Sequence, residues 1–439
     1  MTNLHARCPA LMIGAAGSGQ GKTLLTAALA RLHRRAGRKV QVFKCGPDFL
    51  DGTLHRQASG QPVYNLDLWM LGEAQCRRLL AEAAADNDLL LIEGVMGLYD
   101  GNPSSADLAA TFQLPLAAVI DAQGLAQTFA ALAHGLHGFR DGLNWHGVIA
   151  NRVGSGHHVE LLQQSLSGAL PLLAALPRDA RLQLPERHLG LVNAAELAEL
   201  DAQLDIAAEL LADSRLAQLP PAVDFRAGAP LADFDGGRPL AGKTIAIAED
   251  LAFSFIYRAN RQCLIRLGAE LVGFSPLADQ PLPACDALWL PGGYPELHAA
   301  LLSGNHRSRD SIRTAAQAGL PILAECGGLL YLLDSLQTAD GEEWPMCGLL
   351  RGRAAMQPRF QAIGLQQLSL DGQTLRGHSF HHSRLDTDLP PLAHCIRRRN
   401  GAAGEPIYRH GAITASYLHG YFDSAPQLVA DIFNGELAG

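Results

Sequence analysis

"ALMIGAAGSGQGKTLLTAALARLHRRAG", residues 10–37, joins an apolar run, a glycine-rich loop and a periodic segment without interruption. The apolar run predicts a buried strand, and the spacing of apolar residues after the loop predicts a helix that stops at Gly37. A strand that turns directly into a helix is the repeating unit of α/β sheets. This stretch therefore predicts that the chain begins with an α/β domain.

The alternation of strands and helices continues through the first half of the chain. Four more short apolar segments are predicted as strands: "KVQVFKCG" (39–46), "DLLLIEGVMG" (88–97), "LPLAAVIDA" (114–122) and "GVIANRV" (147–153). Helical segments such as "LAQTFAALAHGLHGF" separate most of them. Short buried strands that alternate with helices predict a mostly parallel, doubly wound sheet with helices on both faces.

The composition of the chain changes near residue 213. Residues 213–242 are rich in Pro, Gly and Asp with little periodicity, and they are predicted as an interdomain linker. A new alternation then begins with "KTIAIAED", "AELVGFSP", "ALWLPGGYPE" and "PILAECGGLLYL". The sequence therefore predicts a first α/β domain over 1–212 and a second over 243–439.

Charge and composition exclude several classes of protein. The chain has 439 residues and a net charge of −8, with no long basic run, which argues against a nucleic-acid partner. No apolar stretch reaches the roughly 20 residues needed to span a bilayer, and the N-terminus lacks a signal-peptide pattern. The eight cysteines are scattered without a C-x-x-C pair, so neither zinc nor a disulfide framework is indicated. We expect a cytoplasmic protein without a membrane partner.

The glycine loop "GAAGSGQGKT" predicts a phosphate site. It is a variant of the P-loop, because the strict pattern places glycine where this chain has Ala16. The backbone N–H groups around three glycines can still surround a polyphosphate: Gly17, Gly19 and Gly21. Lys22 would reach the β- and γ-phosphates of ATP, and the Thr23 hydroxyl would ligate Mg²⁺. The alternative is a glycine-rich turn with an incidental lysine.

Two acidic residues at strand ends support a magnesium site. Asp48 follows the second predicted strand, and Glu93 ends the third. Ligands of doubly wound sheets bind outside the carboxyl ends of the strands, where both side chains should lie. Carboxylates there can hold Mg²⁺ directly or through water. For Asp48 the alternative is the capping of a turn or helix.

The second domain carries a candidate nucleophile, Cys326, between a predicted strand and a helix. Such a turn exposes the thiol near a helix N-terminus, which should lower its pKa. Gly327 and Gly293 could donate backbone N–H groups to an oxyanion, and His419 in "ASYLHGYF" could act as the base. The alternative is a buried packing cysteine. The histidine-rich stretch 377–384 is predicted as a strand or a substrate surface and receives no catalytic role.

These motifs together resemble a known family. "AECGG" with "YLHGYF" resembles the glutaminase domain of class I glutamine amidotransferases. "GAAGSGQGKT", "FKCGPDFLDGTLH", "NLDLWM", "IEGVMGLYDG" and "LPERHLGL" resemble the ATP-dependent domain of the cobyrinic acid a,c-diamide synthases. The resemblance implies a dethiobiotin synthetase-like first domain and amidation of the a and c acetates of cobyrinate or hydrogenobyrinate in cobalamin biosynthesis. Its substrates would be the corrin polycarboxylate, glutamine and ATP, with Mg²⁺ as cofactor.

The resemblance also implies roles for particular residues. The nucleophile falls on Cys326 and its activating base on His419, as a dyad. Many class I glutaminases have a glutamate two residues after the histidine, whereas this chain has Tyr421, so the residue that orients His419 is not identified. Asn151 resembles the adenine-reading asparagine of dethiobiotin-type synthetases.

Two other functions stay open at this point. Another ATP-dependent amidotransferase, such as cobyric acid synthase, shares both domains. A nucleotide switch or chaperone with an inactive glutaminase-like module is a different class, but such a module needs neither Cys326 nor His419. The oligomeric state, for example a homodimer, and the choice between cobyrinate and hydrogenobyrinate are also open.

Overall fold

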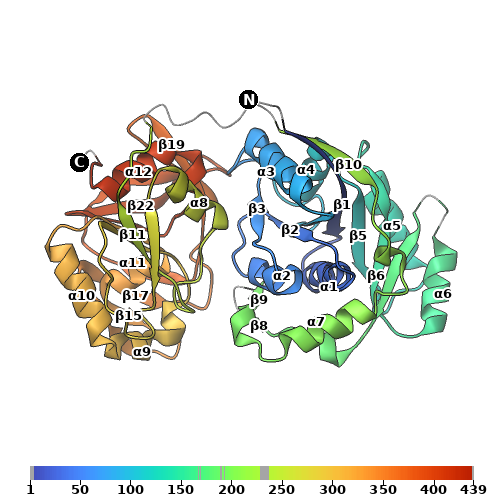
Figure 1. Ribbon diagram of the computed structural model, residues 1–439. Helices are drawn as coiled ribbons and strands as arrows, with labels where there is room; N and C mark the ends of the chain where they lie inside the picture. The colour runs from blue at the N-terminus through green and yellow to red at the C-terminus, as the bar shows by residue number, and fades with distance from the viewer. Residues whose placement is uncertain are drawn as a thin grey trace. The chain divides into compact units, whose positions relative to one another are not determined.

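The computed structural model divides into two compact units, residues 1–231 and 232–439, and each is described by itself (Figure 1). The structure describes residues 4–166, 168, 170–187, 190–191, 193–227 and 237–437. In these ranges no helix is both long enough and apolar enough to cross a membrane.

The first unit is built on a sheet with the strand order β3-β2-β4-β1-β5-β6-β7. Every neighbouring pair on this path is parallel, as the sequence predicts. The strands are β1 (His5–Ala15), β2 (Val40–Cys45), β3 (Tyr64–Leu66), β4 (Leu89–Glu93), β5 (Leu116–Asp121), β6 (Trp145–Val153) and β7 (Leu172–Pro177). All five strands that the sequence predicts in this half are present.

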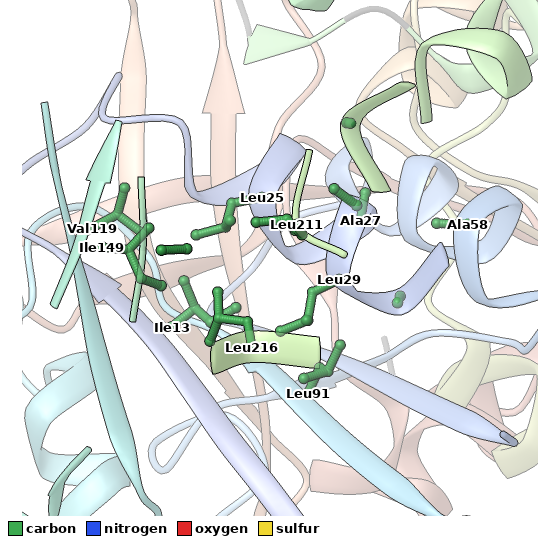
Figure 2. Packing of buried hydrophobic residues seen from close by; sticks show 14 of the residues in the cluster. Ile13, Leu25, Ala27, Leu29, Ala58, Leu91, Val119, Ile149, Leu211 and Leu216 are labelled. Carbon is green, nitrogen blue, oxygen red and sulfur yellow. The ribbon is translucent and has the colours of Figure 1, made fainter. Parts of the chain in front are cut away.

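Helices cover both faces of this sheet, because successive strand residues point to opposite sides. Ile13 packs against one helical layer and Met12 against the other. The first layer consists of α1 (Lys22–Arg35), α2 (Asp51–Ser59) and α7 (Leu200–Glu209) (Figures 1 and 2). The opposite layer consists of α3 (Glu73–Asp86), α4 (Ser105–Phe112), α5 (Thr128–Gly138) and α6 (Gly156–Ser165). The doubly wound fold is therefore confirmed.

Part of the range predicted as a linker has regular structure. A short 3-10 helix, η3, spans Arg215–Ala217, and strand β10 spans Ala222–Arg226. Strand β10 pairs antiparallel with β1, and Phe225 is buried in the core of the first unit. Residues 228–236 lie outside the described residues. The sequence pattern did not predict this strand, because Pro and Gly residues are frequent around 222–226. The residues of β1 that pair with it lie more than 200 positions earlier in the chain.

The second unit has a ten-stranded sheet with the order β12-β11-β13-β14-β23-β22-β21-β18-β19-β24. Its first five strands are parallel: β12 (Glu270–Phe274), β11 (Thr244–Ala248), β13 (Ala287–Leu290), β14 (Ile322–Glu325) and β23 (Ile413–Ser416). The others extend it with antiparallel pairs: β22 (Ala403–His410), β21 (Pro391–Arg397), β18 (Ala362–Leu370), β19 (Gln373–His381) and β24 (His419–Gly420).

Strand β14 of this sheet leads into a six-residue helix, α11 (Gly327–Leu332). The helix packs on one face of the sheet, where Ile322 and Ala324 contribute to the same core. The other face carries α8 (Arg258–Arg266) and α12 (Pro426–Asn434). This packing places the turn at Cys326 at the carboxyl ends of the parallel strands.

Candidate active sites

The predicted phosphate loop lies between β1 and α1. Gly19 and Gly21 have φ angles of 73° and 93°, a left-handed backbone that glycine adopts without strain. A Cβ on Gly21 would lie 2.3 Å from the Nδ2 atom of Asn151. That Nδ2 group donates to the Gln20 carbonyl over 2.9 Å. The structure thus brings the predicted adenine-reading residue against the phosphate loop itself.

Lys22 begins helix α1 and is 7% exposed. Its ammonium group donates to the carbonyl oxygens of Met96 (2.6 Å) and Gly17 (3.2 Å), so it lies across the loop. Burial lowers its pKa, although the Glu93 carboxylate opposes the shift. A desolvated cation at a helix N-terminus suits the charge of a phosphoryl group.

Glu93, at the end of β4, is 1% exposed and is surrounded by donors. Its Oε1 atom accepts from Thr23 Oγ1 (2.7 Å) and Lys44 Nζ (2.9 Å), and its Oε2 atom pairs with His55 Nε2. Burial raises the pKa of this carboxyl, but the positive charge of Lys44 and the His55 hydrogen bond outweigh burial and hold it well below its usual range. Glu93 is therefore an anion held by its neighbours.

Lys44 and His55 are functional candidates that the sequence reasoning missed. Lys44 lies near the end of β2, is buried, and also pairs with Asp51 over 2.7 Å. Burial disfavours its charge, yet the carboxylates of Asp51 and Glu93 hold its pKa well above the usual value. Both residues occur in the quoted block "FKCGPDFLDGTLH". A lysine in an otherwise buried strand was the available signal, because a buried cation needs acidic partners.

Asp48 accepts a hydrogen bond from the backbone N–H of Asp51 over 2.9 Å, next to the start of α2. This contact matches the capping alternative. Burial, and then the charge of Asp51, raise the pKa of Asp48 to about 7.

The predicted nucleotide and metal residues line one cavity of about 710 Å³. This size falls within the range of small-molecule sites. Its polar lining includes Gly19, Gly21, Lys22, Thr23, Lys44, Asp48, Asp51, Glu93, Asn151 and Arg152. Gly17 is linked to this lining through its carbonyl, which accepts from Lys22.

The donor set of this cavity fits Mg²⁺, which prefers oxygen ligands. Thr23, Asp48 and Asp51 line the cavity and carry side-chain oxygens. Both oxygens of Glu93, and one of Asp51, are already held by side chains. Over the described residues, no group of three or more His, Cys, Asp or Glu side chains is arranged to hold a metal. An ion bound here would therefore need ligands from the nucleotide or from water.

In the second unit, Cys326 lies at the sharp turn between β14 and α11, with φ 44° and ψ −102°. This backbone is strained for a residue other than glycine. The turn is held in place because the Cys326 N–H donates to the Ser416 carbonyl over 2.7 Å. Strands β14 and β23 pair directly before it, with Glu325 opposite Ser416.

The expected low pKa of the thiol is wrong for this structure. Cys326 is 5% exposed, and burial raises the pKa of its thiol far above the usual value. The Glu296 carboxylate adds to the rise, and the Gly327 N–H only partly opposes it. The effect of burial on the thiol pKa therefore exceeds the opposite effect expected from the N-terminus of the short helix α11. The thiol therefore needs a base to remove its proton.

The two predicted oxyanion donors lie side by side. A Cβ on Gly327 would be 2.9 Å from the backbone nitrogen of Gly293. A Cβ on Gly328 would be 2.1 Å from the Leu290 carbonyl, so the turn packs closely on the segment that follows β13. Two adjacent backbone N–H groups next to a nucleophile are the usual composition of an oxyanion hole.

His419 is buried in β24 and stacks on His378, with ring centres 4.9 Å apart. A Cβ on Gly292 would lie 2.3 Å from its Cε1 atom, so this histidine packs against the oxyanion segment. Burial lowers the pKa of His419 well below its usual value, so the imidazole is neutral in this structure. The stretch 377–384 contributes the end of β19 and the start of β20 (Ser383–Asp386), and its His378 stacks on His419.

Both units match models of known protein families. Residues 11–192 match the model of the CobQ/CobB/MinD/ParA nucleotide binding domain, and residues 244–427 match the CobB/CobQ-like glutamine amidotransferase domain. The chain is 55% identical to the hydrogenobyrinate a,c-diamide synthase of Pseudomonas aeruginosa over 428 residues, which cover 97% of each chain. It is 48% identical to the cobyrinate a,c-diamide synthase of Herminiimonas arsenicoxydans, again over 97% of each.

The chain belongs to the cobyrinate a,c-diamide synthase family. The P-loop nucleotide-binding fold of the first unit and the glutaminase-like fold of the second agree with the two matched domains. In this family member, the position of the usual triad acid holds Tyr421, which is fully buried and packs its ring against Tyr257 at 5.6 Å.

Glu93→Gln should lower ATP-dependent amidation by about 100-fold and raise the Mg²⁺ concentration required. A carboxamide keeps the size of Glu93, but it removes the charge that holds Lys44 and replaces one acceptor oxygen with a donor. Folding should survive, because Lys44 keeps Asp51 as its partner. Amidation rates across a Mg²⁺ titration measure the effect.

Glu73→Gln is a matched control, since Glu73 is an exposed carboxylate of the same unit. It should behave as wild type, and glutamine hydrolysis should persist in both variants. A wild-type rate with an unchanged Mg²⁺ dependence in Glu93→Gln would make Glu93 a structural residue only.

Gly292→Ala should lower glutamine-dependent amidation at least tenfold, because the new methyl group would collide with His419 and displace the base (a shift of about 1 Å can cost ~100-fold). Amidation with free ammonia should be unaffected. Gly304→Ala is the control, since a Cβ there would meet nothing within 4 Å. Equal activity of the two variants with glutamine would contradict the placement of His419.

Proposed function

We propose that this protein uses ATP and glutamine to amidate the a and c acetate carboxylates of cobyrinate or hydrogenobyrinate in cobalamin biosynthesis. The observation that carries the proposal is the match to synthases of these names over 97% of both chains. Cys326 and His419 are both buried, and His419 packs against Gly292 while Gly293 lies beside Gly327. This arrangement supports a working glutaminase over a nucleotide switch with an inactive module.

The first unit would activate the corrin carboxylate, which is a poor electrophile by itself. A carboxylate oxygen attacks the γ-phosphorus of ATP, ADP leaves, and an acyl phosphate forms. Lys22 stabilises the charge on the transferring group. Mg²⁺, when bound with ATP, neutralises the phosphate oxygens, and Thr23 and Asp48 are the residues that would hold it. Glu93 positions Thr23 and Lys44 at this site.

The second unit would release ammonia from glutamine. His419 takes the thiol proton as Cys326 attacks the side-chain carbonyl carbon, and the Gly293 and Gly327 N–H groups hold the oxyanion. His419 then gives the proton to the leaving nitrogen, so ammonia departs and a thioester remains. Water hydrolyses the thioester to glutamate. Ammonia attacks the acyl phosphate, phosphate leaves, and the amide forms.

The test is an assay of purified protein with ATP and glutamine on cobyrinate and, separately, on hydrogenobyrinate, read by mass spectrometry. Two amidations of one corrin, located on the a and c acetates, are the expected result. Four amidations at other side chains would instead indicate a cobyric acid synthase. Free ammonia in place of glutamine separates the two centres.

A further inference from the structure

The position two residues after the base His419, where many class I glutaminases have a glutamate, holds Tyr421 here. The imidazole of His419 stacks on His378, which burial keeps neutral by lowering its pKa to about 3. Stacking restricts the orientation of the imidazole ring, but it does not determine the position of the backbone to which the ring is attached. The pairing of β24 with β19 holds the peptide of His419 on one side, and a second contact joins it to the strand that ends at Cys326.

Glu325, the residue directly before the nucleophile, makes that contact. Its Oε1 atom accepts from the backbone N–H of Gly420 over 2.8 Å, and Gly420 directly follows His419. Its Oε2 atom accepts from the indole N–H of Trp289 over 2.8 Å. Both partners and Glu325 itself are buried. The carboxylate thus joins the backbone beside the base to the strand that ends at the nucleophile.

A second side chain restrains the opposite side of the same residue. The Asn260 amide donates to the Gly420 carbonyl over 2.8 Å and accepts from the Phe422 N–H over 2.9 Å. Asn260 lies on helix α8, whereas Glu325 lies on β14. Of these two contacts, only the one from Glu325 connects the backbone next to His419 with the strand that ends at the nucleophile.

We propose that Glu325 is the positioning residue of the glutaminase dyad, holding the peptide after His419 in register with the turn that carries Cys326. Its effect passes through the backbone, whereas the orienting acid of a triad acts on the imidazole. This inference rests on the proposed glutaminase role of Cys326 and His419. A reacting pair displaced by about 1 Å can lose about 100-fold in rate, so a contact of this kind bears directly on turnover.

Glu325→Gln tests the proposal because a carboxamide has one acceptor oxygen where the carboxylate has two. Its NH₂ group must face one of the two N–H donors, Gly420 or Trp289. The expected result is a fall of about 10- to 100-fold in kcat for glutamine hydrolysis, with little change in KM. Ammonia-dependent amidation should be unchanged.

Trp289→Phe removes the competing donor and leaves the Gly420 contact in place. Alone it should keep a near wild-type kcat, and combined with Glu325→Gln it should restore much of the lost kcat, because the carboxamide oxygen is then free to accept from Gly420. A merely structural role predicts the opposite, since the double variant would be worse than either single one.

Wild-type kcat in Glu325→Gln, or a double variant worse than Glu325→Gln, would overturn the proposal. If Glu325→Gln does not fold, replacing Gly420 with glycolic acid removes the N–H and leaves every side chain intact, and the same loss of kcat is required. Cys326→Ser distinguishes a failure of the proposed glutaminase role from a failure of the proposed positioning role. An active Cys326→Ser protein refutes the glutaminase itself, whereas an inactive one beside a fully active Glu325→Gln refutes only the positioning role.

Discussion

Cys326→Ser should abolish glutamine-dependent amidation, a loss of more than about 10³-fold, while amidation with high concentrations of ammonia continues. The serine hydroxyl is a much weaker acid than a thiol, and burial at this turn already disfavours the anion. His419 then has no proton that it can readily remove. The acyl phosphate chemistry that we propose for the first unit involves neither residue, so an external nitrogen donor should still support amidation.

The measurement compares product formation with each nitrogen donor, alongside glutamate release. Cys285→Ser is a suitable control, because Cys285 is a partly buried thiol of the same unit outside the proposed site. It should retain both activities. If Cys326→Ser lost the ammonia-dependent and glutamine-dependent reactions equally, the assignment of two separate centres would be refuted.

Lys22→Ala should stop amidation with either nitrogen donor, by at least about 10²-fold, because the carboxylate can no longer be activated. The ammonium group of Lys22 is buried across the phosphate loop, and no other described lysine contacts that loop's carbonyls. Its removal leaves the charge on the transferring phosphoryl group without this partner. Glutamine hydrolysis at Cys326 should continue at its basal rate.

Lys39→Ala serves as the control, since Lys39 is an exposed lysine before β2. Amidation by that variant should match wild type. Product formation at the wild-type rate in Lys22→Ala, with either donor, would rule out the phosphate-loop role. Loss of basal glutamine hydrolysis in the same variant would count against the independence of the two centres.

Local sequence patterns predicted most of the elements that position both sites. The apolar run before the glycine loop and the spacing after it define β1 and α1, because both patterns act within a few residues. The same holds for the turn at Cys326, where two glycines follow an apolar strand. Strand β10 escaped prediction, since its pairing partner β1 lies more than 200 residues away and its segment is flanked by turn residues. Of the antiparallel strands of the second unit, only the stretch 377–384 was predicted as a possible strand, and it contributes to β19.

The site residues divide in the same way. Lys22 and Thr23 belong to one motif, so their chemistry was readable without a structure. Lys44 and His55 were overlooked, because only folding brings them to Glu93, 49 and 38 residues away along the chain. His378 was set aside as one of many histidines, and only the pairing of β19 with β24 places it against His419.

The sequence by itself determined the two α/β domains and the phosphate loop, and it indicated a candidate nucleophile and base, because these depend on local periodicity, glycine conformation and short motifs. Tertiary structure alone decided the charge states and the positioning contacts. Burial of Cys326 raises a pKa that its place before a helix was expected to lower, and burial depends on strands packed around it from elsewhere in the chain. Glu325 and Gly420 are 95 residues apart in the sequence, and the pairing of β14 with β23 brings their two segments together.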